Sequence, residues 1–288
     1  MDLCNPKEIK ALLGRHGFRF SKQMGQNFLI QEWVPRQTAE ASGAAPGVGV
    51  LEIGPGIGPL TAQLARRGEK VVSVELDRTL LPILAETLSD YDNVEIVPGD
   101  ILKTDIAALC RERMPGLPVV ACANLPYNIT TPVITALLQA QCFQAVTVMI
   151  QREVAQRLCA PQGSSEGGSF SLFLQYYMKP ELLFDVPPEK FLPAPKVTSA
   201  VIRCVRRERP AVDVADESFF FKVMRGGFLL RRKTLANSLS AALPGIPKES
   251  IQQAITDMGL PAAVRGEQLT LEDFAALSAA LGREADGD

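Results

Sequence analysis

The chain has 288 residues, of which 47% are hydrophobic and 22% are charged, and its net charge is −2. This length and composition predict a globular protein with two domains and exclude a disordered or fibrous chain. No apolar run approaches the roughly 18 residues of a membrane span, and the first residues lack the apolar core of a signal peptide, so we expect a cytoplasmic protein without membrane contact.

Cysteine and histidine usage excludes several chemistries. The six cysteines form no Cys-x-x-Cys pair, which argues against a zinc ribbon and against a dithiol redox site. The single histidine, His16, makes Ser-His-Asp hydrolysis and a multi-histidine metal centre poor candidates. We therefore predict no metal site.

Strands and helices alternate from residue 49 onward. Apolar runs at 50–53, 71–74, 94–97, 119–123 and 145–150 predict strands, and the segments 59–67, 79–88, 132–139 and 153–159 predict helices between them. Continuous apolar strands separated by helices indicate a parallel sheet that is covered on both faces. The predicted fold class is α/β, with a doubly wound, Rossmann-like sheet.

The pattern changes in the second half of the chain. A Gly/Ser-rich loop is expected at 161–169, and strands are expected at 182–186 and 199–206. From about residue 208 only helices are predicted, at 217–230, 233–242, 248–258 and 271–281. We place the domain boundary there, with a catalytic domain at 1–207, including an N-terminal basic arm, and a small all-helical domain at 208–288.

A glycine-rich loop, with Gly54, Gly56 and Gly58, follows a predicted strand and opens a helix. In this position backbone N–H groups at the helix N-terminus can face a ligand, although such a loop alone is a weak signal. The dinucleotide fingerprint needs its third glycine at position 59, where this chain has Pro59. Binding of a nicotinamide cofactor is therefore disfavoured.

Two acidic residues follow the next two strands. Glu75 lies 21 residues beyond Gly54, where a carboxylate can bind both ribose hydroxyls of a nucleoside, and Asp100 lies 25 residues further on, where it could accept a hydrogen bond from an adenine amino group. Each also has an alternative role as a helix cap or a solvated turn residue. Ligands of open α/β sheets bind at the carboxyl ends of the strands, so this convergence predicts an adenosine cofactor.

The tetrapeptide Asn124-Leu125-Pro126-Tyr127 follows the fourth strand and suits methylation of a nucleobase amine. An exocyclic amine is flat, conjugated and weakly nucleophilic, so a site must orient it with hydrogen-bond acceptors while an aromatic ring holds the base. Asn124 and Tyr127 can supply these two functions, and Pro126 stiffens the loop. The alternative is an ordinary surface turn between strand and helix.

Positive charge is concentrated late in the chain. Residues 196–240 contain ten Lys or Arg and four Asp or Glu, a local charge of +6, and the remainder of the chain carries −8. Such a cluster suits neutralisation of phosphates, although a solvated helix face explains it as well.

These strings together resemble the ribosomal RNA adenine N6-dimethyltransferases, a family that uses S-adenosylmethionine to dimethylate two adjacent adenosines near the 3′ end of small-subunit (16S) rRNA. The matching segments run from about residue 20 to residue 240, and their order and spacing make chance agreement implausible. They are the glycine loop and residues 25–29, 74–77, 99–100, 124–129, 151–154, 191–201 and 231–238.

The resemblance implies roles for the cofactor residues. Asn27 and Leu29 would close over S-adenosylmethionine from the N-terminal side, while the loop of Gly54 and Gly56 would face its methionine part. Glu75 would hold the ribose and Asp100 the adenine. Asn124 would lie at the junction between the cofactor and the target amine.

The resemblance also implies how the RNA would be held. Leu125 would offer its backbone carbonyl to the target amine, and Phe191 would form a second aromatic wall opposite Tyr127, with a hydrophobic plug beneath its loop as the alternative role. Residues gripping the RNA backbone would be Arg203, Arg206, Arg207, Arg225, Arg231, Arg232 and Lys233. The implied partner is 16S rRNA within a partly assembled small ribosomal subunit, bound by a monomer that contributes to ribosome biogenesis.

Three rival functions remain open at this point. A related methyltransferase of large-subunit rRNA is the nearest, but the segments 191–201 and 231–238 look like the small-subunit branch. A non-catalytic assembly or RNA-binding factor could retain the fold, although every expected cofactor position holds a competent residue. A nicotinamide oxidoreductase is disfavoured by Pro59.

Overall fold

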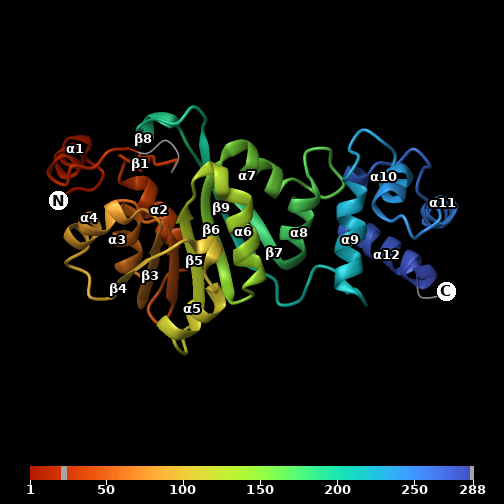
Figure 1. The fold of residues 1–288 in the computed structure, drawn as a ribbon, viewed down its shortest axis with the longest axis horizontal. Helices are drawn as coiled ribbons and strands as arrows, with labels where there is room; N and C mark the ends of the chain where they lie inside the picture. The colour runs from red at the N-terminus through yellow and green to blue at the C-terminus, as the bar shows by residue number, and fades with distance from the viewer. Residues whose placement is uncertain (21–24, 286–288) are drawn as a thin grey trace. The chain divides into compact units, whose positions relative to one another are not determined.

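The chain folds into two compact units (Figure 1). The structure, a computed structural model, describes residues 1–20 and 25–285. The first unit comprises Met1–Ala155 and Glu181–Arg206, and the second comprises Gln156–Pro180 and Arg207–Asp288. None of the helices in the described ranges is long and apolar enough to cross a membrane.

A seven-stranded sheet forms the centre of the first unit. Its strands, in spatial order, are β4 (Val94–Pro98), β3 (Lys70–Glu75), β2 (Gly49–Ile53), β5 (Val119–Asn124), β6 (Phe143–Gln151), β9 (Ser199–Arg206) and β7 (Met178–Val186). The first five are parallel to one another, and β9 is antiparallel to β6. The predicted doubly wound α/β class is confirmed.

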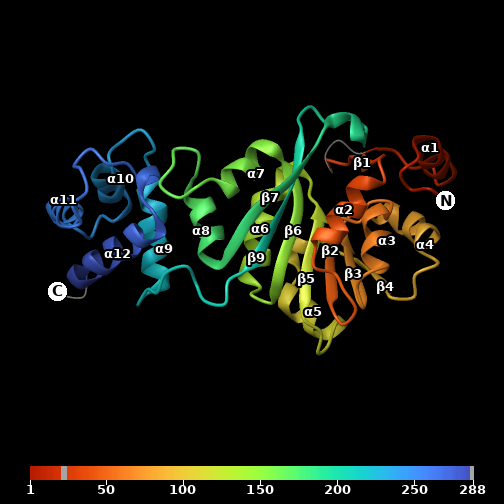
Figure 2. The ribbon, with the colours of Figure 1, turned by 180° about the vertical axis from the view of Figure 1, so that it is seen from behind.

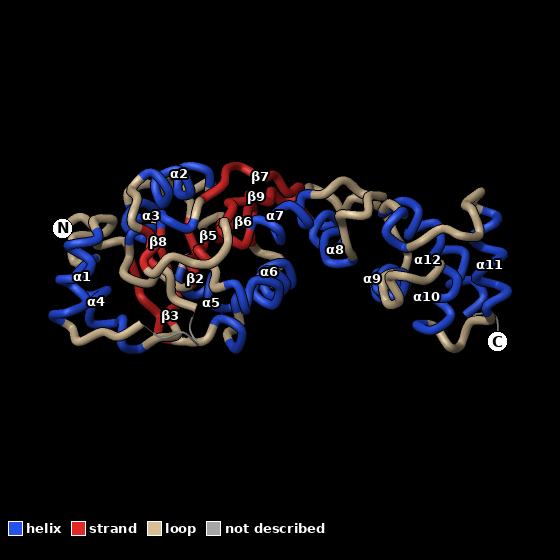
Figure 3. Tube along the Cα trace, turned by 90° about the horizontal axis from the view of Figure 1, so that it is seen from above, coloured by secondary structure: helices blue, strands red, loops and turns tan. Residues whose placement is uncertain are grey.

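Helices cover both faces of this sheet. They are α2 (Trp33–Ala41), α3 (Pro59–Ala65), α4 (Leu81–Thr87), α5 (Ile106–Arg113), α6 (Thr130–Gln139) and α7 (Arg152–Cys159). In Figure 3, α2 and α3 lie on one face, and α5 and α6 lie on the other. From β2, the strands β3 and β4 are added on one side of the sheet, and β5 and β6 are added on the other. The order thus switches between β2 and β5, and open α/β sheets bind ligands in the crevice at such a switch point.

The N-terminal segment is more structured than a basic arm. Helix α1 (Pro6–Arg15) is capped by Asn5, whose side chain accepts a hydrogen bond from the Lys7 N–H at 2.9 Å. Its buried face packs in one hydrophobic cluster with the buried face of α4, and Figure 2 shows these helices side by side. Strand β1 (Phe28–Leu29) then pairs antiparallel with β8 (Phe191–Leu192). This pairing brings two predicted site segments together across about 160 residues of sequence.

The second unit is helical. It contains α8 (Ser169–Tyr177), α9 (Glu217–Gly227), α10 (Leu235–Ala242), α11 (Lys248–Asp257) and α12 (Leu271–Ala285). Residues 156–180, which the sequence predicts in the first domain, group with the helices instead. The physical reason is that Leu172 and Tyr176 of α8 are buried in the same core as Phe220, Leu239 and Phe274. The RNA-binding role of this unit stays a prediction.

Candidate active site

The glycine loop joins β2 to α3 as the sequence predicts. Gly54, Gly56 and Gly58 have φ angles of 66°, 62° and 93°, a region that glycine adopts without the steric cost of a side chain. A Cβ on Gly56 would lie 3.2 Å from the Phe28 ring, so β1 packs closely against the loop. Pro59 occupies the first turn of α3, where its missing N–H costs nothing.

Glu75, at the end of β3, is fixed by the backbone around it. Its Oε2 accepts a hydrogen bond from the Gly56 N–H at 3.2 Å, and its Oε1 accepts one from the Asp77 N–H at 2.8 Å. The residue is only 5% exposed, and this burial raises the pKa of the carboxyl group against the opposing effect of these hydrogen bonds. A carboxylate has about four acceptor sites, so acceptor capacity remains for a ligand in the pocket.

Asp77 and Asp100 stabilise the turns that follow β3 and β4. Gln26 donates a hydrogen bond to Asp77 Oδ2 at 2.7 Å and so attaches the N-terminal segment to the sheet edge. Asp100 Oδ1 accepts from the Leu102 N–H at 3.0 Å and caps a 3-10 turn. Asp100 therefore has the capping role that was the alternative to adenine binding. The other oxygen of Asp100, Oδ2, lies 3.8 Å from Lys103 Nζ.

Asn124 ends β5 and begins the loop that leads to α6. The neighbouring Leu125 N–H donates to the Met149 carbonyl at 3.1 Å, which ties the loop to β6. Within the described residues, neither the Asn124 side chain nor the Leu125 carbonyl has a hydrogen-bond partner. Both groups are thus available to a ligand.

Tyr127 is held by a residue that the sequence analysis did not single out. Its hydroxyl lies 2.7 Å from Ser199 Oγ, and Ser199, the first residue of β9, is fully buried. Burial of Tyr127 raises the pKa of its phenol, although the hydrogen bond with Ser199 opposes this effect. The hydrogen bond restricts the ring to one orientation beside Asn124.

Phe191, Leu29 and Asn27 meet where β1 pairs with β8. Phe191 and Leu29 are each 3% exposed and pack in one hydrophobic cluster with Val34, Met149 and others. Phe191 thus has the buried, plug-like packing that was the alternative to an aromatic wall. The Asn27 side chain donates to the Gly25 carbonyl at 3.0 Å and shapes the turn before β1.

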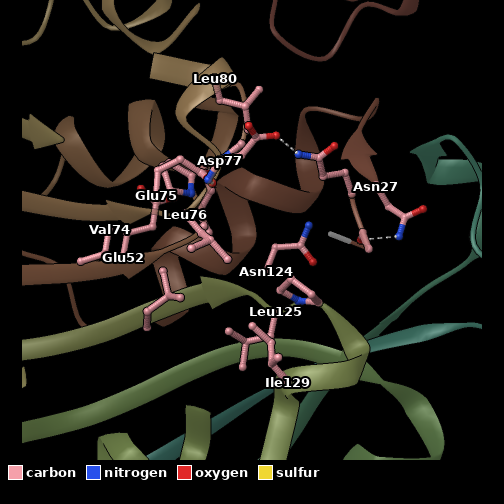
Figure 4. Close-up of a pocket in the computed structure, with 18 of the residues that line it drawn as sticks. Asn27, Glu52, Val74, Glu75, Leu76, Asp77, Leu80, Asn124, Leu125 and Ile129 are labelled. Atoms are coloured by element: carbon pink, nitrogen blue, oxygen red, sulfur yellow. Dashed lines mark hydrogen bonds between the residues drawn. The ribbon is translucent and has the colours of Figure 1, made fainter. Parts of the chain in front are cut away.

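One pocket at the carboxyl edge of the sheet collects these residues (Figure 4). In the figure, Glu75 and Leu76 from β3 and its following turn lie on one side of the pocket, and Asn124 and Leu125 lie on another. The residues that were predicted for the cofactor and the target base all line it: Asn27, Leu29, Gly54, Gly56, Glu75, Asp100, Asn124, Leu125, Tyr127 and Phe191. In the described part of the chain, no three His, Cys, Asp or Glu side chains lie close enough to hold a metal ion.

The seven predicted RNA-contact residues fall into two groups. Arg225, Arg231, Arg232 and Lys233 are exposed, and their side chains form no ion pair with any described residue. The other three bind or pack against the protein itself. Arg206 donates to the Gln141 carbonyl at 2.6 Å, Arg207 donates to the Gln175 carbonyl at 2.9 Å, and Arg203 is half-buried with its Nε shielded from solvent.

Glu52 is a pocket residue that the sequence analysis missed. It lies in β2 and is 1% exposed, and its Oε2 accepts a hydrogen bond from Ser73 Oγ at 2.6 Å. Its Oε1 has no hydrogen-bond partner among the described residues. Burial raises the pKa of Glu52 to about 7, against the opposing hydrogen bond from Ser73. The sequence did contain a signal for Glu52. A carboxyl group in the middle of an apolar strand is costly to bury, so its presence there indicates a functional or structural role.

We expect Glu52→Gln to stabilise the ligand-free protein at pH 8. Folding raises the pKa of Glu52 from about 4.5 to about 7. Between these two pH values the folded state binds more protons than the unfolded state, so the wild type loses stability as the pH rises through this range. The variant should lack this loss, which is on the order of 1 to 3 kcal/mol. Thermal unfolding of both proteins between pH 4 and pH 8 measures it. Glu69→Gln, at an exposed carboxylate, is the control, and an equal pH profile for wild type and Glu52→Gln would contradict the expectation.

Comparison with known proteins decides the family. A family model described as ribosomal RNA adenine dimethylase matches residues 17–280. The chain belongs to the ribosomal RNA adenine dimethylase family. It is accordingly a methyltransferase that acts on adenine in rRNA.

Relatives of this chain match over nearly its whole length. Ribosomal RNA small subunit methyltransferase A of Geobacillus kaustophilus is 46% identical over 284 residues, which cover 97% of each protein. The protein of the same name from Bacillus mycoides is 45% identical over 284 residues, again with 97% of each covered. The predicted family is confirmed.

Two solved structures share the fold. The 23S rRNA methyltransferase ErmE superposes with a TM-score of 0.68 at 26% identity, covering 89% of this chain and 100% of that one. A dimethyladenosine transferase from Plasmodium falciparum superposes with a TM-score of 0.72 at 23% identity, covering 89% and 98%. At 23% identity, the similarity to the Plasmodium falciparum structure shows a shared fold alone.

Proposed function

We propose that this chain uses S-adenosylmethionine to dimethylate, at N6, two adjacent adenosines in a 3′-terminal hairpin loop of small-subunit (16S) rRNA. The observation that carries the proposal is one pocket lined by the glycine loop, by Glu75 and by Asn124, whose side chain has no hydrogen-bond partner among the described residues. The branch within the family follows from identity, because the relatives at 45% and 46% are named for the small subunit, whereas the 23S enzyme is 26% identical.

The pocket residues fit S-adenosylmethionine. Its ribose hydroxyls need acceptors, which the remaining acceptor capacity of the Glu75 carboxylate would supply. The buried Glu52 lines the same pocket and would offer a carboxyl dipole, rather than a full negative charge, near the sulfonium. Gly54 and Gly56, which lack side chains, would let the methionine part approach the backbone, and Asp100, which lines the same pocket, would accept a hydrogen bond from the adenine amino group. When bound, this cofactor supplies an electrophilic methyl group on a sulfonium.

Asn124 and Leu125 would orient the target amine. The Asn124 side-chain oxygen and the Leu125 carbonyl would accept its two hydrogens and turn the nitrogen lone pair towards the methyl group. An amide is too weak a base to remove the proton, so the proton leaves to water after the charged amine has formed. Orientation of this kind can lower a barrier by several kcal/mol, roughly 7 to 11 at its limit.

Tyr127 would hold the target adenine by stacking. Removing the base from the stack in its RNA loop costs roughly a few kcal/mol of free energy, and stacking on an aromatic ring can offset that cost. Ser199 would keep the Tyr127 ring in place through its hydrogen bond at 2.7 Å. Phe191, which packs in one hydrophobic cluster with Leu29, would support the pocket from beneath rather than stack on the base.

The exposed cations of the helical unit would hold the RNA backbone. Arg231, Arg232 and Lys233 directly precede α10, whose N-terminal dipole disfavours cations, so an external anion would explain them. We expect Arg231→Ala/Arg232→Ala to weaken rRNA binding and to lower the slope of log affinity against log salt by about 1.5. Filter binding at several salt concentrations measures this slope. An unchanged affinity would remove these residues from the interface.

We further propose that the substrate is 16S rRNA in a partly assembled small subunit, and that the protein works as a cytoplasmic monomer. Incubation of labelled S-adenosylmethionine with small subunits that lack the modification tests the 16S rRNA target and the dimethylated product directly. The proposal predicts label in N6,N6-dimethyladenosine of 16S rRNA, and an unlabelled 16S rRNA after long incubation would overturn it.

A further inference from the structure

The turn between α9 and α10 exposes two adjacent leucines. Leu229 is 57% exposed and Leu230 is 40% exposed, and no other large hydrophobic residue in the described part of the helical unit is as exposed. We call these residues the leucine pair. Neither contributes to the hydrophobic core of its own unit, so core packing does not account for them.

The backbone of this turn is held rigidly. The Leu230 N–H donates to Ser238 Oγ at 2.9 Å, and the same hydroxyl donates to the Gly226 carbonyl at 2.6 Å. Ser238 is fully buried, and the Lys233 N–H closes the turn onto the Leu230 carbonyl at 2.8 Å. The leucine pair therefore projects from a fixed support, which reduces the entropy lost when it binds.

The sequence on both sides of the leucine pair is strongly positive. Residues 218–248 contain six Lys or Arg and no Asp or Glu. Arg231, Arg232 and Lys233 follow the pair directly, and Arg225 lies one helical turn before it. An apolar tip between cations complements a partner that offers both phosphates and flat apolar surfaces. RNA with unpaired bases has this composition.

We propose that the leucine pair is an apolar wedge that stacks against unpaired bases of the rRNA, while residues 231–233 hold the flanking phosphates. The inference rests on the proposed function and adds a base contact to it. Apolar side chains including leucine are used in this way by proteins that open base steps. An anionic membrane is the other surface that such a patch could bind, but two leucines on a turn offer too little apolar area to anchor a protein there.

Binding of a double variant tests the wedge. Leu229→Ala/Leu230→Ala should bind a 16S rRNA hairpin about ten-fold more weakly, because the apolar contact with the bases is lost, with the salt slope unchanged. Arg231→Ala/Arg232→Ala should lower the slope instead. Leu102→Ala, which truncates a leucine that is 42% exposed in the other unit, is the matched control and should keep wild-type affinity. Thermal unfolding confirms that each variant is folded.

A fluorescent base makes the test specific. With 2-aminopurine in the hairpin loop, the wild type should raise the fluorescence by unstacking the base, and the leucine variant should not. Equal affinity and equal fluorescence for the wild type and the leucine variant would overturn the wedge. Methyl transfer by the wild type would in that case leave the proposed function intact. Retained rRNA affinity together with leucine-dependent binding to anionic phosphatidylserine vesicles would overturn it in favour of a membrane contact. A wild type that binds neither the hairpin nor small subunits lacking the modification would overturn both proposals.

Discussion

Replacement of Asn124 by Ala should reduce kcat for methyl transfer by about 10² to 10³-fold, which corresponds to a loss of about 3 to 4 kcal/mol in transition-state stabilisation. The reason is that Asn124 carries an acceptor aimed into the pocket with no partner in the described protein. The variant removes that acceptor without breaking an internal hydrogen bond. Its stability should therefore change little. Single-turnover transfer from labelled S-adenosylmethionine to undermodified small subunits measures the effect.

Asn128→Ala is the matched control for this experiment. It removes the same amide from the same loop. Asn128 also lines the pocket, but its side chain is exposed, whereas that of Asn124 is half-buried. Its kcat should stay within about ten-fold of wild type, because no acceptor at the proposed reaction centre is lost. Equal loss in both variants would assign the effect to a disturbed loop. A wild-type kcat for Asn124→Ala would contradict the mechanism.

Replacement of Glu75 by Ala should weaken S-adenosylmethionine binding by at least about 10²-fold, since hydrogen bonds to a charged group contribute about 1.5 to 3 kcal/mol each. The carboxylate would accept both ribose hydroxyls, and it also accepts the N–H groups of Gly56 and Asp77 at 3.2 and 2.8 Å. Its removal thus costs direct contacts and loosens the glycine loop. Calorimetric titration with the cofactor measures the affinity.

Glu69→Ala provides the comparison for Glu75. The Glu69 carboxylate also accepts a backbone N–H, that of Gly47 at 3.3 Å, but it does not line the pocket. Cofactor affinity should remain at the wild-type value in this variant. If Glu75→Ala binds S-adenosylmethionine as tightly as wild type, Glu75 does not hold the ribose.

The sheet could be predicted from sequence because buried parallel strands are apolar along their whole length. Val50 and Leu51 of β2 are fully buried, and such runs stand out between polar turns. The two-residue strands β1 and β8 could not be predicted, since pairing between Phe28–Leu29 and Phe191–Leu192 depends on the folded chain rather than on local pattern. Short capped helices such as α1 and α5 lacked enough apolar repeats to be recognised.

The C-terminal helices show where local pattern was wrong. The segment 217–230 was predicted as one helix, but α9 ends at Gly227. Two successive glycines weaken the helix there, and the buried Ser238 hydroxyl captures the Leu230 N–H that would otherwise continue it. This contact between neighbouring helices is not visible in the sequence.

Site residues were predictable to the extent that they follow strands. Glu75, Asp100 and Asn124 each end a strand or follow one directly, so topology alone places them at one edge. Glu52 was missed because it lies inside a strand that reads as core. Ser199 was missed because its contact with Tyr127 spans 72 residues of sequence.

Mass-spectrometric mapping of 16S rRNA from cells that lack this chain tests the central claim most directly. The account predicts that two adjacent N6,N6-dimethyladenosines near the 3′ end become unmodified, that wild-type protein restores them, and that Asn124→Ala does not. A fully dimethylated adenosine pair in the cells without this chain would contradict it.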